Sequence, residues 1–214
     1  MIISRKGKAK KRKAERLRNK KLIDRYPWIS PVNWHWKRIP SYDFTMYDDV
    51  PKGWKRAFGK IMLEEYREAL IRCNYLDKFQ WIQVKEKYGT LRLYSNAAPK
   101  EVSDLESKYD HISGYFCIEC GRMNVPVLTG GWVEPLCEDC YNKRIARQKR
   151  WHEKNHPDRE FEYTPYKNLK KEEQKLDMIA VYKHFSADRR DYEEKRDYSD
   201  TINKIIARQE KLFG

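Results

Sequence analysis

The chain has 214 residues, of which 36% are charged and 40% hydrophobic, and its formal net charge is +14. This length suffices for one sizeable domain with extensions, or for two small domains. No stretch approaches the roughly 20 consecutive apolar residues of a membrane-spanning helix, which argues against a helical membrane protein. The first residues are basic and no apolar stretch follows them, so we expect no secretory signal and a cytoplasmic location.

The positive charge is concentrated at the two ends of the chain. Residues 1–22 carry eleven Lys or Arg and a single acid, residues 23–140 carry sixteen against seventeen acids, and residues 141–214 carry nineteen against fourteen. An electrically balanced centre with cationic ends is typical of a folded module that carries basic arms. Such arms favour a polyanionic partner.

The first basic stretch, residues 5–21, has too few apolar residues to bury a face, so we expect a disordered arm or a loose helix. Facing nucleic acid, its side chains would displace counterions from phosphates without reading sequence. A solvated tail or a localisation signal is the alternative. The predicted nucleic-acid contacts in this arm are Lys10, Lys11, Arg12, Lys13, Arg16 and Arg18.

An aromatic, proline-containing segment from Tyr26 to Tyr47 follows, and we expect it to cover a core, with base stacking on its rings as the alternative. Apolar residues at three- and four-residue steps predict a helix over Lys52–Asn74, with Cys73 as a buried thiol. Alternating apolar residues around Tyr88-Gly89 predict a hairpin of strands 79–87 and 90–94. A second helix is expected over Pro99–Ser113.

Two Cys-x-x-Cys pairs form the most specific motif. Cys117 with Cys120 and Cys137 with Cys140 enclose sixteen residues, a spacing typical of a four-thiolate zinc site. β-prone runs around Thr129-Gly130-Gly131 predict a short hairpin that returns the chain to the second pair. Two disulfides are the alternative, and a reducing compartment disfavours them. Because all four ligands are thiolates, no position remains for a catalytic water, so the predicted Zn²⁺ is structural.

The segment after the last cysteine, Tyr141–Trp151, contains five basic residues and no acid, and the absence of Gly and Pro predicts a cationic helix. We expect it to lie along phosphates, although it would equally offset the negative charge of a four-thiolate zinc centre. The predicted nucleic-acid contacts are Lys143, Arg144, Arg147, Lys149 and Arg150.

Two further helices are expected after a linker at residues 156–165. The first, Leu169–Phe185, has two apolar stripes, and the second, Asp200–Phe213, has one clear apolar face. The predicted fold class is therefore α+β, with a small mixed core containing an antiparallel hairpin, a four-cysteine zinc ribbon and C-terminal helices. The predicted segments are a basic arm (1–22), the α+β core (23–114), the zinc ribbon (115–141) and a helical C-terminal region (142–214).

The order of the motifs YPWISP, DDVPKGWKRAFG and QVKEKYGTLRLY with the two cysteine pairs resembles a family of small zinc-ribbon proteins encoded by phages and prophages. The resemblance covers residues 26–140, about half of the chain. It implies a phage setting and an accessory role, and it supplies no catalytic residues.

Three functions from different classes follow. The chain is expected to be a non-enzymatic protein that binds DNA, RNA or a nucleoprotein through its basic arms. The alternatives are a phage inhibitor, anti-CRISPR or otherwise anti-defence, that contacts a host effector complex, and a metal-dependent nuclease. The nuclease interpretation is weak, because Asp110-His111 precedes both cysteine pairs and Tyr141 stands where a second histidine would be needed. His152 and His156 are more simply surface residues than a metal pair.

Overall fold

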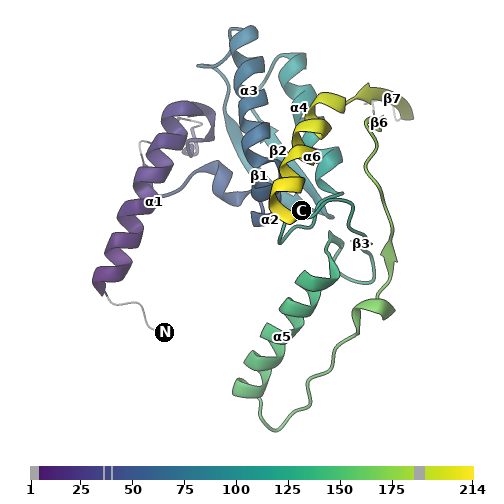
Figure 1. Ribbon diagram of the computed structural model, residues 1–214. Helices are drawn as coiled ribbons and strands as arrows, with labels where there is room; N and C mark the ends of the chain where they lie inside the picture. Colours follow the sequence, from purple (N-terminus) through teal and green to yellow (C-terminus); the bar gives the residue numbers. More distant parts are fainter. Residues whose placement is uncertain (1–4, 36, 40, 186–190) are drawn as a thin grey trace. The chain divides into compact units, whose positions relative to one another are not determined.

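The computed structural model describes residues 5–35, 37–39, 41–185 and 191–214, and it has a mixed α and β fold (Figure 1). The described chain forms two compact units. The first contains residues up to Val50 together with Lys60–Glu86 and Leu91–Asp110, and the second contains Pro51–Gly59, Lys87–Thr90 and the part that follows His111. No helix among the described residues is long and apolar enough to cross a membrane.

The first unit is built from helices and most of one hairpin. Its elements are α1 (Arg5–Arg25), η1 (Pro27–Ile29), η2 (Met46–Asp49), α3 (Lys60–Arg72), β1 (Trp81–Lys87), β2 (Thr90–Ser95) and α4 (Lys100–Ser113), of which the hairpin turn and the last residues of α4 fall in the second unit. The predicted hairpin and the helix predicted over Pro99–Ser113 are thus confirmed with small shifts of their ends. The helix predicted over Lys52–Asn74 is present as α3, preceded by a short helix and a π-helical turn at residues 52–59, and Cys73 is half-buried rather than buried. The hairpin turns at Tyr88 (φ 53°) and Gly89 (φ 81°), the conformation that two-residue hairpins favour.

Aromatic side chains form the centre of the first unit. The ring of Tyr66 on α3 lies 5.8 Å from that of Phe79 and 5.3 Å from that of Trp81, and the ring of Trp28 lies 6.5 Å from that of Phe79. All four side chains are fully buried. Burial of such large apolar surfaces is the main stabilising contribution in a small core.

The aromatic segment that was expected to cover the core does so only in part. Trp28 is fully buried, whereas the side chain of Trp34 is 83% exposed and its ring lies 3.4 Å from that of His35. Trp36 lies outside the described residues. The core-cover prediction therefore holds for Trp28 and is wrong for Trp34.

The basic arm is helical. Residues 9–18 of α1 are exposed, as expected for a sequence without an apolar face, and Asn19 is the first buried residue that the structure describes in this helix. The buried Asn19 donates its Nδ2 hydrogen to the carbonyl of Tyr42 over 2.9 Å. The Nη2 atom of Arg25 donates to both carboxylate oxygens of Glu64 over 2.8 Å, and its Nε donates to one of them over 3.1 Å. These contacts hold the C-terminal half of α1 on the first unit.

The second unit contains the cysteines. Its elements are α2 (Lys52–Trp54), the π-helical turn η3 (Lys55–Gly59), β3 (Val127–Leu128), β4 (Glu134–Pro135), α5 (Glu138–Asn155), η4 (Tyr166–Asn168), β5 (Lys171–Glu172), β6 (Ile179–Phe185), β7 (Asp191–Asp197) and α6 (Ser199–Phe213). Strand β3 pairs antiparallel with β4, placing Val127 opposite Pro135, and also with β5, placing Val127 opposite Glu172. The short hairpin predicted between the cysteine pairs is therefore present, and β5 adds a third strand.

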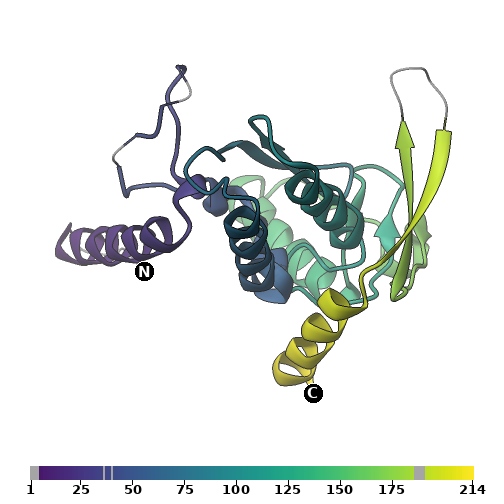
Figure 2. The same cartoon turned by 90° about the horizontal axis from the view of Figure 1, so that it is seen from above.

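The helix predicted over Leu169–Phe185 is wrong. The chain instead forms β5 and then β6, which pairs antiparallel with β7 in register Ile179 to Asp197 (Figure 2). Consecutive apolar residues fit both a helix with two apolar stripes and a strand, and the β-branched and aromatic run that starts at Ile179 favours the strand. The last helix, α6, is confirmed, with Ile202 and Ile205 buried on its apolar face.

Candidate metal centre

The first cysteine pair lies in a tight turn that the backbone closes on itself. The amide of Cys117 donates to the carbonyl of Arg122 over 2.8 Å, and the amide of Gly121 donates to the carbonyl of Cys117 over 2.8 Å. Gly121 has φ 82°, a left-handed conformation that disfavours any side chain. This turn, residues 117–122, is called the first knuckle below.

The second cysteine pair lies at the start of α5. Cys137 is the N-cap residue of this helix and Cys140 lies in its first turn. The chain before it is held by the buried hydroxyl of Tyr166, which donates to the carbonyl of Leu136 over 2.9 Å. A helix N-terminus carries a partial positive charge, which stabilises thiolates placed there.

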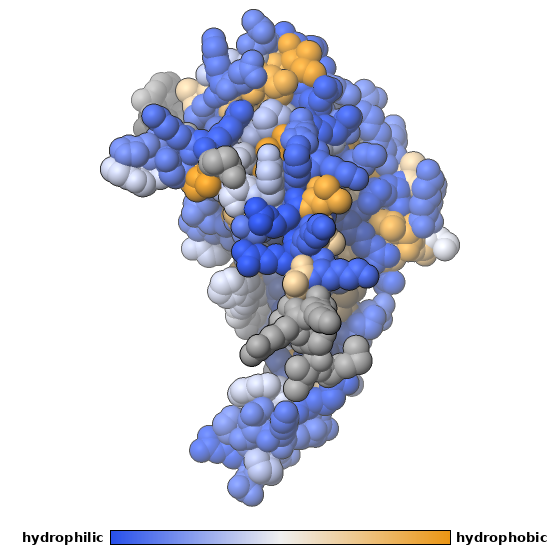
Figure 3. Space-filling model, turned by 90° about the vertical axis from the view of Figure 1, so that its left-hand side faces the viewer, coloured by the Kyte–Doolittle hydropathy of each residue, from blue (hydrophilic) through white to orange (hydrophobic). Residues whose placement is uncertain are grey.

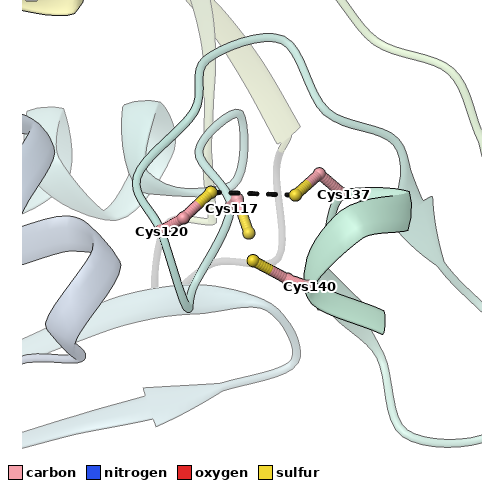
Figure 4. Close-up of side chains that lie close together, drawn as sticks. All are labelled: Cys117, Cys120, Cys137 and Cys140. Carbon is pink, nitrogen blue, oxygen red and sulfur yellow. Dashed lines mark hydrogen bonds between the residues drawn. The ribbon is translucent and has the colours of Figure 1, made fainter. Parts of the chain in front are cut away.

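The four sulfurs converge on one point, as Figure 4 shows, and all lie within 4.8 Å of one another. The Sγ atoms of Cys120 and Cys137 are 3.7 Å apart, and none of the four cysteines forms a disulfide. A disulfide would require about 2.05 Å. A tetrahedral ion with sulfur bonds of about 2.3 Å sets its ligands about 3.8 Å apart, so the spacing fits a metal ion. Among the described residues this is the only group of three or more His, Cys, Asp or Glu side chains that can hold one.

The surroundings of the sulfurs favour thiolates unequally. The pKa of Cys117 is lowered to about 5, chiefly by a hydrogen bond from the Cys137 thiol and also by backbone N–H groups that point at its sulfur. The pKa of Cys140 is raised to about 12 by burial and by the negative charge of Cys117. Negative charges crowded in this way repel one another, and a divalent cation among them would remove the repulsion.

The first knuckle rests on a segment more than sixty residues away in sequence. The amide of Gly53 donates to the carbonyl of Ile118 over 2.8 Å, and the buried indole Nε1 of Trp54 donates to the carbonyl of Phe116 over 2.9 Å. The two backbone segments lie so close together that a Cβ on Gly53 would be 2.2 Å from the carbonyl oxygen of Cys117. Helical periodicity predicted an apolar face that includes Trp54 but did not reveal this contact with the first knuckle.

Helix α6 fastens the other side of the first knuckle. The side-chain amide of Gln209 donates to the carbonyl of Gly121 over 2.8 Å, and its oxygen accepts from the amide of Met123 over 3.2 Å. The guanidinium of Arg56 lies 4.9 Å from the ring centre of Phe213. In Figure 1 the C-terminal end of α6 accordingly lies beside α2. Sequence patterns predicted the apolar face of α6 but not its polar contact with the knuckle.

A cationic hollow adjoins the metal centre. It has a volume of about 520 Å³, and Cys120 and Cys140 form part of its wall. Five exposed basic side chains surround it, and Ala146 and Glu119 complete the lining. The five are Lys52, Arg56, Lys143, Arg147 and Arg150.

Three of the five basic residues predicted on α5 line this hollow and two do not. Arg144 is half-buried and binds the carboxylate of Glu134, and one of its terminal nitrogens lies 3.4 Å from the carboxylate of Glu119. Lys149 lies 3.9 Å from Glu153 on the exposed helix. Arg144 therefore braces the ribbon, a role that its basic character alone did not indicate.

The predicted contacts in α1 belong to the first unit and are all exposed. Arg12 and Arg16 lie 3.4 and 3.5 Å from the carboxylate of Asp43, and Arg18 lies 2.8 Å from that of Asp48. Lys11 lies 3.9 Å from Glu15. Lys10 and Lys13 make no ion pair with any described residue. The face turned to the viewer in Figure 3 is largely hydrophilic.

The remaining candidate residues do not assemble a second site in the described part of the chain. Asp110 is bound by Arg92, and the ring of His111 lies 5.6 Å from that of Tyr115. The rings of His152 and His156 are 5.4 Å apart, and no third ligand for a metal accompanies them among the described residues.

No family model, curated protein or solved structure matches this chain.

Proposed function

We propose that this chain is a non-enzymatic nucleic-acid-binding protein in which Zn²⁺, held by the four cysteines, assembles a phosphate-binding surface. The observation that carries the proposal is the hollow lined by Lys52, Arg56, Lys143, Arg147 and Arg150. The two nearest alternatives, a protein target and a nuclease, are outcomes of the experiment below.

Zinc is the metal that this ligand set favours. Four thiolates in tetrahedral geometry select Zn²⁺ or iron, and paired Cys-x-x-Cys units on a short hairpin are typical of structural zinc. The sulfurs fill every coordination position, which leaves none for water or substrate. The role proposed for the ion is to hold the first knuckle against the start of α5.

The cations of the hollow exceed what the metal centre needs. A four-thiolate zinc centre carries a net charge of about −2. Five basic side chains and one carboxylate, that of Glu119, line the hollow. Neutralising both the centre and Glu119 leaves a surplus of about two positive charges, and the contact of Arg144 with Glu119 increases it. The surplus is available to a polyanion.

The geometry of the cations suits phosphate groups along a chain. Lys143, Arg147 and Arg150 follow one another at four and three residues, so they lie on one face of α5. On the other segment that lines the hollow, the guanidinium of Arg56 lies 4.9 Å from the ring centre of Phe213. The N–H groups of an arginine guanidinium can donate to phosphate oxygens. Lys52 lies four residues before Arg56 in the same segment.

The exposed cations of α1 supply a second, sequence-independent attraction in this proposal. Lys10 and Lys13, with the outward-facing arginines of the helix, would add phosphate contacts and raise the association rate. Because the motif order resembles that of phage-encoded zinc-ribbon proteins, the proposed binding would take place in the cytoplasm of a bacterial host.

The test is a salt titration of binding with a charge-matched control. Arg147→Glu/Arg150→Glu should weaken binding of the zinc-loaded protein to DNA and RNA, and should reduce the slope of log K against log salt by about 1.4 for single strands or 1.8 for duplex. The control, Lys78→Glu/Lys204→Glu, changes the net charge equally at exposed positions that do not line the hollow. Fluorescence anisotropy of labelled DNA and RNA measures the affinity and its salt dependence for each variant.

Equal weakening by the two variants would refute the role of the hollow. Binding that requires a host protein, together with no salt-dependent binding to nucleic acid, would support the inhibitor alternative. Cleavage of plasmid or RNA in the presence of Mg²⁺ and its loss in His111→Ala would support the nuclease.

A further inference from the structure

Two turn tips of the second unit present aromatic rings to solvent. The side chain of Trp132, at the tip between β3 and β4, is 74% exposed, and that of Tyr88, at the tip between β1 and β2, is 70% exposed. They are the two most exposed large hydrophobic side chains that the structure describes in this unit. Neither ring contributes to a core, so packing does not account for the aromatic residues at these two positions.

The two tips pack against each other through Gly89. A Cβ on Gly89 would lie 3.2 Å from Cδ of Pro135, 3.4 Å from Cα of Glu134 and 3.5 Å from the carbonyl oxygen of Val133. Tyr88 precedes Gly89, and Trp132 precedes Val133. Because consecutive Cα atoms are about 3.8 Å apart, the two aromatic residues are close enough for a few consecutive nucleotides of one strand to reach both.

The support beneath the rings is well fixed. Gly89 and Glu134 are buried, and Glu134 is bound by Arg144 of α5. On the other side of the ribbon hairpin, the amide of Thr129 donates to the carbonyl of Lys170 over 2.9 Å. A rigid support reduces the entropy that a partner must remove on binding.

A cation lies beside the ring of Tyr88, and a lysine lies beside Gly130 in the turn that carries Trp132. The ammonium of Lys87 lies 5.2 Å from the ring centre of Tyr88, and a Cβ on Gly130 would lie 3.3 Å from Cβ of Lys170. Both lysines are exposed, and the carboxylate of Glu134 in the ribbon is buried and bound by Arg144. Exposed rings beside cations complement a partner that carries flat apolar faces and negative charge together.

We infer that Tyr88 and Trp132 form a stacking surface for the bases of single-stranded nucleic acid. This inference rests on the proposed function and adds the strand class to it. In a duplex the faces of the bases are covered by their neighbours, whereas an open strand offers them to aromatic side chains. Stacking tolerates any base, so the surface selects single strands without reading sequence.

The experiment compares single strand with duplex for variants of the zinc-loaded full chain. The probes are fluorescein-labelled oligo(dT), oligo(U) and a mixed-sequence duplex, each longer than the roughly 4–16 nucleotides that a single-strand module covers. Trp132→Ala and Tyr88→Ala should each lower single-strand affinity about 5- to 150-fold and leave duplex affinity nearly unchanged. Trp132→Phe, which keeps a ring, should retain most of the affinity.

Trp34→Ala is the control, because Trp34 is 83% exposed and belongs to the other unit. It should leave single-strand affinity near that of the unaltered chain. Equal affinity of Trp132→Ala and the unaltered chain for single strands would overturn the inference, as would equal losses for duplex and single strand.

The two proposals fail separately. If Arg147→Glu/Arg150→Glu weakens binding to every probe while the aromatic variants do not, the proposed role of the cationic hollow is supported and the stacking surface is refuted. If no probe binds at all, both proposals are refuted.

Discussion

Replacing Gly53 by alanine tests how closely the metal centre depends on the segment beneath it. Gly53 lies in α2, with φ in the ordinary negative range, so helix propensity alone predicts that alanine stabilises the protein by about 0.5–1 kcal/mol. The structure predicts the opposite. The new Cβ would lie 2.2 Å from the carbonyl oxygen of Cys117 and 2.6 Å from the carbonyl carbon of Ile118.

Both clashing groups are backbone, so the first knuckle itself must move. Forcing an extra carbon into a packed site costs about 1–3 kcal/mol. Displacement also breaks the 2.8 Å hydrogen bond from the Gly53 amide to the Ile118 carbonyl. Leaving such buried groups unpaired costs about 1–3 kcal/mol more. After the gain in propensity, Gly53→Ala should lower the free energy of unfolding by about 1–5 kcal/mol.

Zinc affinity reports where this energy is lost. Because about 1.4 kcal/mol corresponds to a factor of ten, a loss confined to the knuckle should weaken zinc binding about fivefold to several thousandfold. The assays are chelator competition for zinc and urea unfolding of the zinc-loaded protein. Gly131→Ala is the matched control, because a Cβ there meets nothing within 4 Å. Unchanged or higher stability of Gly53→Ala relative to Gly131→Ala would refute the reasoning.

Three further substitutions address the metal, the buried indole and the first unit. Cys120→Ser should abolish stoichiometric zinc and lose the tertiary structure of the ribbon, since zinc binding and folding are coupled at such sites; unchanged zinc content and circular dichroism would contradict the assignment. Trp54→Phe removes the 2.9 Å bond to the Phe116 carbonyl and should lower the free energy of unfolding by about 1–3 kcal/mol, measured in urea. Hydrogen bonds from Arg25 hold the pKa of Glu64 below its usual range. The stability from this carboxylate is therefore present above its unfolded pKa of about 4.3 and lost as the pH falls, so the difference in Tm between the unaltered chain and Glu64→Gln should vanish toward pH 3; a constant difference would exclude the ion pair.

Local patterns predicted the elements whose signals lie within a few residues. The two cysteine pairs, the turn at Tyr88-Gly89 and the cationic helix after Cys140 all carry such signals, and the structure contains each of them. The cysteine spacing indicated which sulfurs would meet, because a tetrahedral ion imposes its own geometry on the chain.

The partners of these elements could not be predicted in the same way. Nothing local relates Gly53 to Ile118, or Gln209 to Gly121, because contacts between distant segments depend on the packing of the whole unit. The same holds for Arg144, whose engagement with Glu134 depends on the hairpin register. The sequence of Ile179–Phe185, which forms β6, fits a helix as well as a strand because its apolar residues lack a periodicity that separates the two.

The placement of the cations links the metal centre to the proposed binding surface. Lys52 and Arg56 come from the segment that supports the first knuckle, whereas Lys143, Arg147 and Arg150 come from the helix that begins at the second. These two segments are about ninety residues apart in sequence. The four cysteines join the first knuckle, which rests on residues 52–56, to the start of α5. Without that junction the five cations are solvated separately and their mutual repulsion drives them apart. A metal ion held by the four cysteines would thus sustain a concentration of like charge that the polypeptide alone would disfavour, which is the property that the proposed phosphate-binding surface requires.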